Sequence, residues 1–435
     1  MGVGGMALAW LLGQEKLLAN PATIPQAQQT FDTRPKTPPH DPQAKAMISL
    51  FMHGGPSHVD LFDPKPELTR LSGPDYTGEI QHSFINRATK QLMGSPWKFQ
   101  KHGECGTELS ELLPHTAAIV DDICLIRSMH TDINGHEPSI WFMNTGKAQP
   151  GRPALGSWLT YALGSESQEL PAYVVLRDPG GLPVDGVRNW SNGWMPPLYQ
   201  GTVIRPQEPR ILNLDPPPHL KGDLQQQNLA LLDKLNRQHL ERHPGEADLE
   251  ARIASYELAA KMQVAAKEAL DISGESEATQ KLYGLDQDAT REYGKRCLIA
   301  RRLVERGVRV VSISVGGRRG WDQHGKLRAG LKHNAAVVDQ PIAALLKDLR
   351  ERGLLDSTLV LWGGEFGRTP TCENATETDG RAHHPRGYTM WLAGGGVKPG
   401  FTYGKTDELG AKIAENKVHI HDLHATIMHL LGIDH

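Results

Sequence analysis

The stretch AMISLFMHGGP, residues 46–56, decides the fold because a run that is apolar except for Ser49 turns abruptly into glycines and a proline. Such a run predicts a strand that is buried on both faces and ends in a functional loop. The other predicted strands are residues 123–127, 173–176, 308–315, 358–362 and 388–393. The predicted helices include residues 109–121, 153–163, 291–306, 330–352 and 420–431. This alternation predicts an α/β fold with a mostly parallel central sheet and helices on both of its faces.

One large domain, residues 46–435, accounts for this pattern. Residues 178–220 are rich in Gly, Pro, Trp and Asn, which predicts a long ordered loop or cap over a site. Residues 223–272 are polar and have amphipathic helical spacing with one break. We therefore expect a helical insertion at about residues 223–290.

The N-terminal segment differs from the rest of the chain. Residues 1–22, MGVGGMALAWLLGQEKLLANPA, are apolar and rich in small residues, but too short to span a bilayer. They resemble the apolar and cleavage regions of a signal peptide whose charged start is missing, and a short packed helix is the alternative. Residues 23–45 predict an extended linker. We expect an exported protein without a stable membrane span.

The charge balance argues against one class of partner, and the histidine content favours one class of chemistry. The formal net charge is −3 and no long basic block occurs, so nucleic-acid binding has little support. The 20 histidines fall in clusters beside Asp, Glu and Gly, a pattern typical of metal sites or acid–base chemistry. The oligomeric state is left open.

The loop after the first strand carries the first such cluster. It reads HGGPSHVDLFDPK, residues 53–65, and contains His53, Ser57 and Asp60. Histidine and carboxylate side chains this close can share a cation, and Ser57 beside the glycines can contact an anion. The alternative is an ordinary turn in which an aspartate caps the next helix.

A second cluster follows the strand at residues 123–127. It reads MHTDINGHEPSIWFMNTG, residues 129–146, and a helix is expected to begin near Pro138. His136 and Ser139 would then lie where the helix dipole favours an anion. Capping roles remain plausible for Asp132 and Asn134.

Three further clusters lie in the second half of the chain. GGRRGWDQHGKL, residues 316–327, offers Asp322 and His324 as metal ligands and two arginines that could pair with an anion, Arg318 and Arg319. WGGEFGRTP, residues 362–370, places Glu365 and Arg368 after a strand. GRAHHPRGYTM, residues 380–390, contains His383 and His384, of which one could ligate while the other contacts substrate. In the tail VHIHDLHATIMHLLG, residues 418–432, His421 and Asp422 at a helix start could support the site, whereas ordinary structural roles are favoured for His429 and for the terminal His435.

The combination of HGGPSHVDLFDPKP, NGHEPSIWFMNTG, GWDQHG, GGEFGRTP, GRAHHP and WLAGGGVKPG resembles the bacterial family called domain of unknown function 1501. The resemblance runs from about His53 to the end of the chain. It implies a protein exported by a twin-arginine-type signal, working in the periplasm or at the cell surface. It also implies an alkaline-phosphatase-like three-layer α/β/α sandwich, related to sulfatases.

The resemblance to sulfatases also suggests roles for individual residues. In the register set by Thr145-Gly146, His136 stands where sulfatases have their nucleophile and Ser139 matches the serine of their motif. Ile140 replaces the motif's arginine, which puts ordinary sulfatase chemistry in doubt. Arg368 would hold oxygens of the reacting group.

The metal set implied by the resemblance is rich in imidazole. His53 stands where the superfamily has an acidic ligand, and Glu365-Phe366 stands where it has an Asp-His pair. The full set of expected ligands is His53, Asp60, Asp322, His324, Glu365, His383 and His384. Such a set suits a divalent transition ion, zinc before manganese, better than calcium.

These features support three hypotheses. The first is a metal-dependent hydrolase or transferase that acts on a phosphate or sulfate ester, with a polysaccharide ester as one candidate substrate. The second is a catalytically degenerate relative that binds an anion or a glycan. The third is a protein in which one zinc ion only stabilises the fold. Position 136 distinguishes the first two, because a catalytic role requires His136 to lie beside the metal ligands.

Overall fold

The computed structural model describes residues 31–73, 76–78, 91–220, 222–243, 247–317, 320–373 and 378–434. The proposed signal segment at residues 1–22 and the two anion-binding candidates Arg318 and Arg319 lie outside the described residues. None of the described helices is long and apolar enough to cross a membrane.

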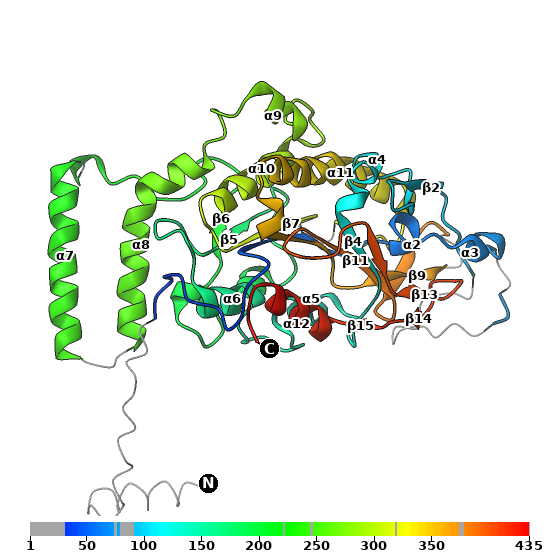
Figure 1. Cartoon of the computed structure of the whole chain (residues 1–435), viewed down its shortest axis with the longest axis horizontal. Helices are drawn as coiled ribbons and strands as arrows, with labels where there is room; N and C mark the ends of the chain where they lie inside the picture. The colour runs from blue at the N-terminus through cyan, green and yellow to red at the C-terminus, as the bar shows by residue number, and fades with distance from the viewer. Residues whose placement is uncertain are drawn as a thin grey trace, which may run out of the picture.

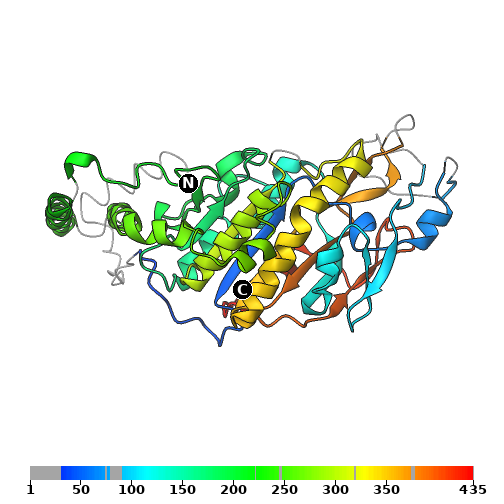
Figure 2. The same cartoon turned by 90° about the horizontal axis from the view of Figure 1, so that it is seen from above.

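A nine-stranded mixed sheet forms the centre of the molecule (Figures 1 and 2). Its order is β12 (Phe401–Tyr403), β4 (Ile123–His130), β11 (Tyr388–Ala393), β8 (Thr358–Gly363), β1 (Ala46–Met52), β7 (Val310–Val315), β5 (Tyr173–Leu176) and β6 (Thr202–Ile204). A further strand, β15 (Val418–His419), pairs with β4. Neighbouring strands in this sheet are parallel except where β11 lies between β4 and β8. The predicted α/β class with a mostly parallel central sheet is confirmed.

Helices cover both faces of this sheet, as Figure 1 shows. One face packs against α10 (Arg291–Glu305) and α11 (Leu327–Glu351), and the other packs against α5 (His136–Thr145), α6 (Leu155–Leu163) and α12 (Ile420–Leu430). Successive residues of β1 point to opposite faces. Ile48 and Leu50 accordingly belong to the first core, and Met47 and Phe51 belong to the second. A strand buried on both faces is what the apolar run predicted.

The helical insertion lies between β6 and α10. It consists of α7 (Asp223–Arg242), α8 (Ala247–Leu270) and the short α9 (Glu277–Leu282). In Figure 1, α7 and α8 lie side by side at one end of the molecule. The predicted pair of helices is present.

Two sequence expectations differ from the structure. The helix expected at residues 109–121 is wrong, because Pro114 begins a separate short helix, α4 (Pro114–Ala117), after β3 (Thr107–Ser110). Leu109 and Leu113 are both buried, so the apolar spacing reported burial without one continuous helix. The expected loop at residues 178–220 also contains β6, which is too short to give a clear pattern.

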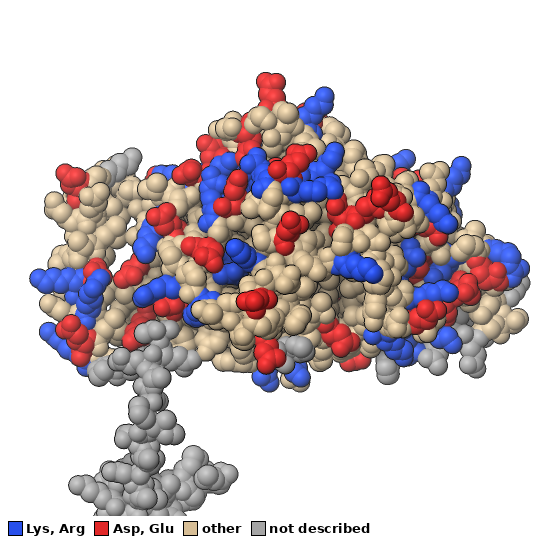
Figure 3. Space-filling model, in the orientation of Figure 1, with Lys and Arg blue, Asp and Glu red and all other residues tan. Residues whose placement is uncertain are grey.

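Small elements complete the fold around the sheet. Short two-stranded sheets pair β2 (Phe99–His102) with β3, β9 (Gly367–Cys372) with β10 (Arg381–His384), and β13 (Lys405–Thr406) with β14 (Ile413–Glu415). Two short helices, α2 (His58–Leu61) and α3 (Pro66–Arg70), follow the loop after β1. On the face shown in Figure 3, acidic and basic side chains of the described residues are intermingled.

Candidate functional site

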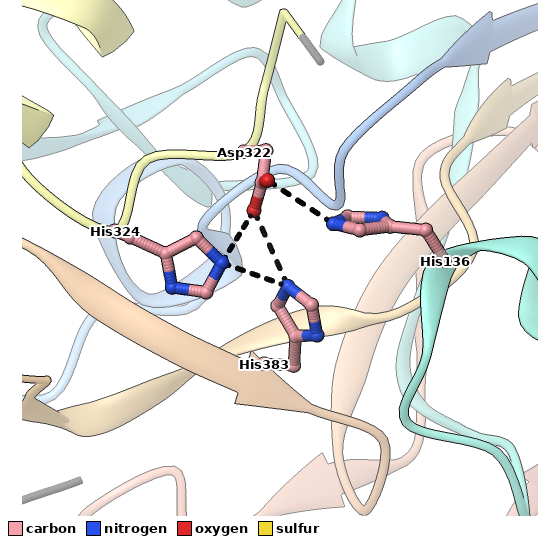
Figure 4. Close-up of side chains that lie close together, drawn as sticks. All are labelled: His136, Asp322, His324 and His383. Atoms are coloured by element: carbon pink, nitrogen blue, oxygen red, sulfur yellow. Dashed lines mark hydrogen bonds and ion pairs between the residues drawn. The ribbon is translucent and has the colours of Figure 1, made fainter. Parts of the chain in front are cut away.

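Five predicted site residues meet at the edge of the sheet where β1, β4, β7 and β8 end. His136 is the first residue of α5, and Asp322 and His324 lie in the loop between β7 and α11. Glu365 follows β8, and His383 lies on β10. The antiparallel direction of β11 brings its start to this same edge, so the preceding segment reaches the site. Figure 4 shows four of these side chains converging, with Asp322 and His324 coming from one loop and His136 and His383 from two other segments.

The Asp322 carboxylate is the centre of this cluster. Its Oδ1 lies 2.8 Å from His324 Nε2 and 3.2 Å from His383 Nε2. Its Oδ2 lies 3.2 Å from His136 Nε2. One ligand atom from each of these four residues lies within 4.8 Å of the others. The structure therefore assembles a carboxylate and three imidazoles from three distant parts of the chain.

His136 is held between two carboxylates. Its Nδ1 lies 2.7 Å from Glu365 Oε1, opposite the contact of its Nε2 with Asp322. Burial alone would lower the pKa of His136, but the hydrogen bonds to Asp322 and Glu365 raise it to about 9. Burial would raise the pKa of Glu365, yet the hydrogen bond and the charge of His136 lower it. His136 lies in the site, as a catalytic or ligand role requires.

Asp322 is also anchored by a buried arginine. Arg368 Nη2 donates to Asp322 Oδ1 at 2.6 Å, and the arginine side chain is wholly buried. The other donors of Arg368 are directed at backbone carbonyls, including those of Gly55 and Arg381, both at 3.0 Å. Burial would raise the pKa of Asp322, but hydrogen bonds from its histidine neighbours and the Arg368 charge hold it well below its ordinary value. Arg368 thus positions the central carboxylate.

The loop after β1 passes very close to this cluster. Gly54 N donates to both oxygens of Glu365, at 3.0 and 3.2 Å. Gly54 has a φ of 109°, and a Cβ at this position would lie 2.4 Å from Asp322 N. Only glycine fits this close approach of two backbones without strain. Glycine here lets the loop orient Glu365 from one side and lie against Asp322 on the other.

His53 lies behind Glu365, at the end of β1. Its ring packs edge-on against Phe51, with ring centroids 4.6 Å apart. Burial lowers the pKa of His53 to about 4, although the charges of Glu365 and Asp178 oppose this effect. Its Nδ1 is buried and makes no hydrogen bond to any described residue. His53 is a neutral imidazole next to the cluster.

The adjacent histidines His383 and His384 have different environments. His383 Nδ1 lies 2.8 Å from the carbonyl oxygen of Asn134, which can only accept, so the ring proton is on Nδ1 and Nε2 faces Asp322. Burial lowers the pKa of His383 to about 4. His384 instead stacks on His58, with ring centroids 6.1 Å apart and an interplanar angle of 12°. His383 is the one that joins the cluster.

Other predicted site residues are used differently. Asp60 forms a fully buried ion pair with Arg381, with contacts of 2.8 and 3.0 Å, and accepts a hydrogen bond from Ser57 Oγ at 2.5 Å. Both oxygens of Asp60 therefore have partners away from Asp322. Ser139 is buried in the first turn of α5, and its Oγ makes no hydrogen bond to any described residue.

Two contributors to the site escaped the sequence analysis. Glu373 is in contact with His324 Nδ1, and the carbonyl of Asn134 orients His383. Asn134 begins the motif NGHEPSIWFMNTG but was considered only as a helix cap, and Glu373 belongs to none of the quoted motifs. A backbone carbonyl has no sequence signature, and Glu373 lies 49 residues from its partner.

The sequence profile described as Protein of unknown function (DUF1501) matches residues 44–435. No curated protein matches the chain. Among solved structures, a lipoteichoic acid synthase from Listeria monocytogenes is similar, with a TM-score of 0.36 and 10% identity, covering 90% of this chain and 72% of that one. A phosphonate monoester hydrolase from Silicibacter pomeroyi has a TM-score of 0.37 and 11% identity, covering 90% and 74%. A sulfatase from Pseudoalteromonas sp. has a TM-score of 0.35 and 11% identity, covering 90% and 68%.

Proposed function

The chain belongs to the DUF1501 family, and we propose that it is a divalent-metal-dependent enzyme that hydrolyses or transfers a phosphate or sulfate ester. The metal would be held by Asp322, His324 and His383, with His136 at the reacting end. Zinc suits this set of nitrogen and oxygen ligands best.

A single observation carries the proposal. The Nε2 atoms of His324 and His383 face each other at 3.0 Å, beside the same oxygen of Asp322. The far nitrogen of each ring is in contact with an acceptor, Glu373 in one case and the Asn134 carbonyl in the other. Outer partners of this kind favour the tautomer in which Nε2 carries the lone pair that can ligate a metal. Two converging nitrogen lone pairs beside a carboxylate form a site for a cation.

The protein's own residues then have distinct tasks. A divalent metal in this site supplies Lewis-acid polarisation of the ester's non-bridging oxygens. Glu365 fixes the ring of His136 through Nδ1, so that Nε2 faces Asp322 Oδ2 at 3.2 Å, on the side of the proposed metal. Water, or an acceptor hydroxyl in a transfer, would attack phosphorus or sulfur as the bond to the leaving oxygen breaks, and we assign to His136 Nε2 the proton that passes to that oxygen. Arg368 and Gly54 keep the two carboxylates in place.

We also propose that the substrate is an ester of a sugar and that the protein works outside the cytoplasm. The apolar segment at residues 1–22 supports export.

Trp194 supports sugar binding, because it is 58% exposed and packs edge-on against Trp158 at 6.1 Å, with the Arg152 guanidinium 5.1 Å from its ring. An aromatic face beside a cation suits an anionic sugar. Trp194→Ala should raise KM for a sulfated oligosaccharide and leave KM for a small aryl ester unchanged.

The proposal is tested by metal content and turnover in parallel. The protein purified with zinc should retain the metal, and Asp322→Asn, which preserves size, should retain one equivalent less than the wild type. Asp286→Ala, a change at an exposed aspartate outside the cluster, is the matched control. Wild-type protein should hydrolyse a phosphate or sulfate ester, and His136→Gln should abolish this without unfolding. Metal binding without turnover on any ester would overturn the enzyme and leave an anion-binding protein.

A further inference from the structure

A second group of potential ligands lies where β15 joins β4. The two strands are parallel, and His419 is the registered partner of His130. Registered neighbours in a sheet present their side chains on the same face, and the two imidazole centroids are 4.9 Å apart. Asp132, two residues beyond His130, brings its carboxylate to the same place. Strand register thus assembles the group.

One distance within this group matches a coordination shell. One ligand atom from each of the three residues lies within 4.8 Å of the others. Asp132 Oδ2 is 3.3 Å from His419 Nε2. Two ligands that each lie about 2.0 Å from a tetrahedral zinc ion are about 3.3 Å apart. His419 Nε2 is buried, and the Asp132 carboxylate 3.3 Å away does not meet it in hydrogen-bond geometry, so a bound cation would satisfy both atoms better than their present contact does.

The surroundings of the group also favour a cation. Asp422 accepts a hydrogen bond from the backbone N–H of His419 at 2.8 Å, which fixes the backbone that carries the ring. Among the described residues, the charges that act on His130 include two carboxylates, Asp132 and Asp422, and the ammonium of Lys417. When His419 ligates through Nε2, its proton moves to Nδ1, and the contact from the His421 N–H is given up. That contact is 3.4 Å long, beyond ordinary hydrogen-bond length, so little is lost.

We propose that His130, Asp132 and His419 bind a second divalent transition ion, with zinc the best fit, and that this ion fixes the loop at residues 131–135. A set of two imidazoles and one carboxylate suits zinc better than it suits calcium or magnesium. The Asp132 side chain is 71% exposed, so the remaining coordination positions are open to water.

The loop at residues 131–135 joins the two clusters. Its Asn134 carbonyl orients His383, and it leads directly into His136. An ion at Asp132 therefore restrains the segment that positions two members of the first cluster. Binding at this second site does not depend on whether the first cluster hydrolyses esters.

The test isolates the second site by calorimetric zinc titration of full-length Asp322→Asn protein. We expect one equivalent to remain bound. Adding Asp132→Asn or His419→Gln should weaken this binding by more than about tenfold, since each removes a ligand. His429→Gln, on the exposed end of α12, is the control and should leave the affinity unchanged. Zinc binding that is absent from Asp322→Asn protein, or that persists unchanged in both double variants, would overturn the proposal.

Hydrogen exchange separates the second site from the proposed function. Zinc should slow amide exchange at residues 131–135 in Asp322→Asn protein, and this protection should vanish when His419→Gln is added. Protection that does not depend on His419 would contradict the role in fixing the loop. Failure of the proposed function would instead appear as equal zinc content in wild-type and Asp322→Asn proteins.

Discussion

Asp60 and Asp322 are two buried aspartates near the same edge of the sheet, and both were predicted to bind metal. Asp60 has arginine and hydroxyl donors as partners, whereas Asp322 has one arginine and three imidazoles. An arginine cannot give up its proton, so Arg381 keeps its ion pair with Asp60 and this carboxylate is closed to a metal. Imidazoles can exchange a proton for a metal, so the Asp322 cluster is open to one. The partners of a buried carboxylate, and not its residue type or location, determine which role it has.

The largest effect should come from breaking the closed pair. Asp60→Ala leaves the fully buried Arg381 without its counter-ion, which should cost about 3–5 kcal/mol in the free energy of unfolding. Urea denaturation measures this loss. Zinc content per folded molecule should stay at the wild-type value. If Asp60→Ala lost zinc with little loss of stability, Asp60 would be a metal ligand, and its contrast with Asp322 would not hold.

A second large effect is expected at the close approach of two loops. Gly54→Ala places a Cβ 2.4 Å from Asp322 N on a backbone with a φ of 109°. Strain and overlap together should lower the free energy of unfolding by about 3 kcal/mol. Because Gly54 N also donates to Glu365, zinc affinity should fall in the same variant. A fully stable Gly54→Ala protein would show that the loops do not approach as described.

His424 lies outside the two carboxylate clusters, and its burial should make the free energy of unfolding depend on pH. Burial lowers the pKa of His424 to about 4, although its ring donates to the Met143 carbonyl at 2.8 Å. In the unfolded state the pKa of His424 is near 6.5, so between pH 4 and pH 6.5 the unfolded state binds more protons than the folded state does. The contribution of His424, up to about 3 kcal/mol, is therefore complete above pH 6.5 and is lost as pH falls toward 4. In His424→Gln, stability plotted against pH should be less steep by about 1.4 kcal/mol per pH unit in this window. If the curves of stability against pH were parallel for the wild type and His424→Gln, the buried neutral state assigned to His424 would be contradicted.

The smallest effect concerns the outer partner of His324. Glu373→Gln keeps the size of the side chain but removes the charge that sets the ring tautomer, which should weaken zinc binding by about tenfold. Thermal stability of the metal-free protein should change little, since the His324 side chain is 41% exposed. Competition with a chelator measures the affinity. An unchanged affinity would remove Glu373 from the site.

Much of the fold could be read from the sequence because its signals are local. The apolar run of β1 and the glycines after it reported burial on both faces and a loop at the strand end. The opposite direction of β11 has no local signal, since an apolar strand looks the same in either orientation. The short β6 was missed because three residues give no clear pattern, and the division near Pro114 was missed although the proline is itself a local signal.

The site could be predicted only in part for a physical reason. Asp322 and His324 lie two residues apart after a strand, so local spacing identified them. Asp60 looked equivalent, because its partner Arg381 is 321 residues away and could not be seen from the loop itself. The same limit applied to His383 and His384, whose neighbours come from other segments. Residue types indicated the chemistry, and only the packing assigned the partners.

The most direct test is anomalous diffraction at the zinc absorption edge from crystals of the zinc-loaded protein, with Asp60→Asn and Asp322→Asn crystals beside it. We predict a strong peak between Asp322, His324 and His383 in the wild-type and Asp60→Asn crystals, and no peak there in Asp322→Asn. A peak beside Asp60, or none at Asp322 under saturating zinc, would contradict the assignment of the open cluster as the metal site.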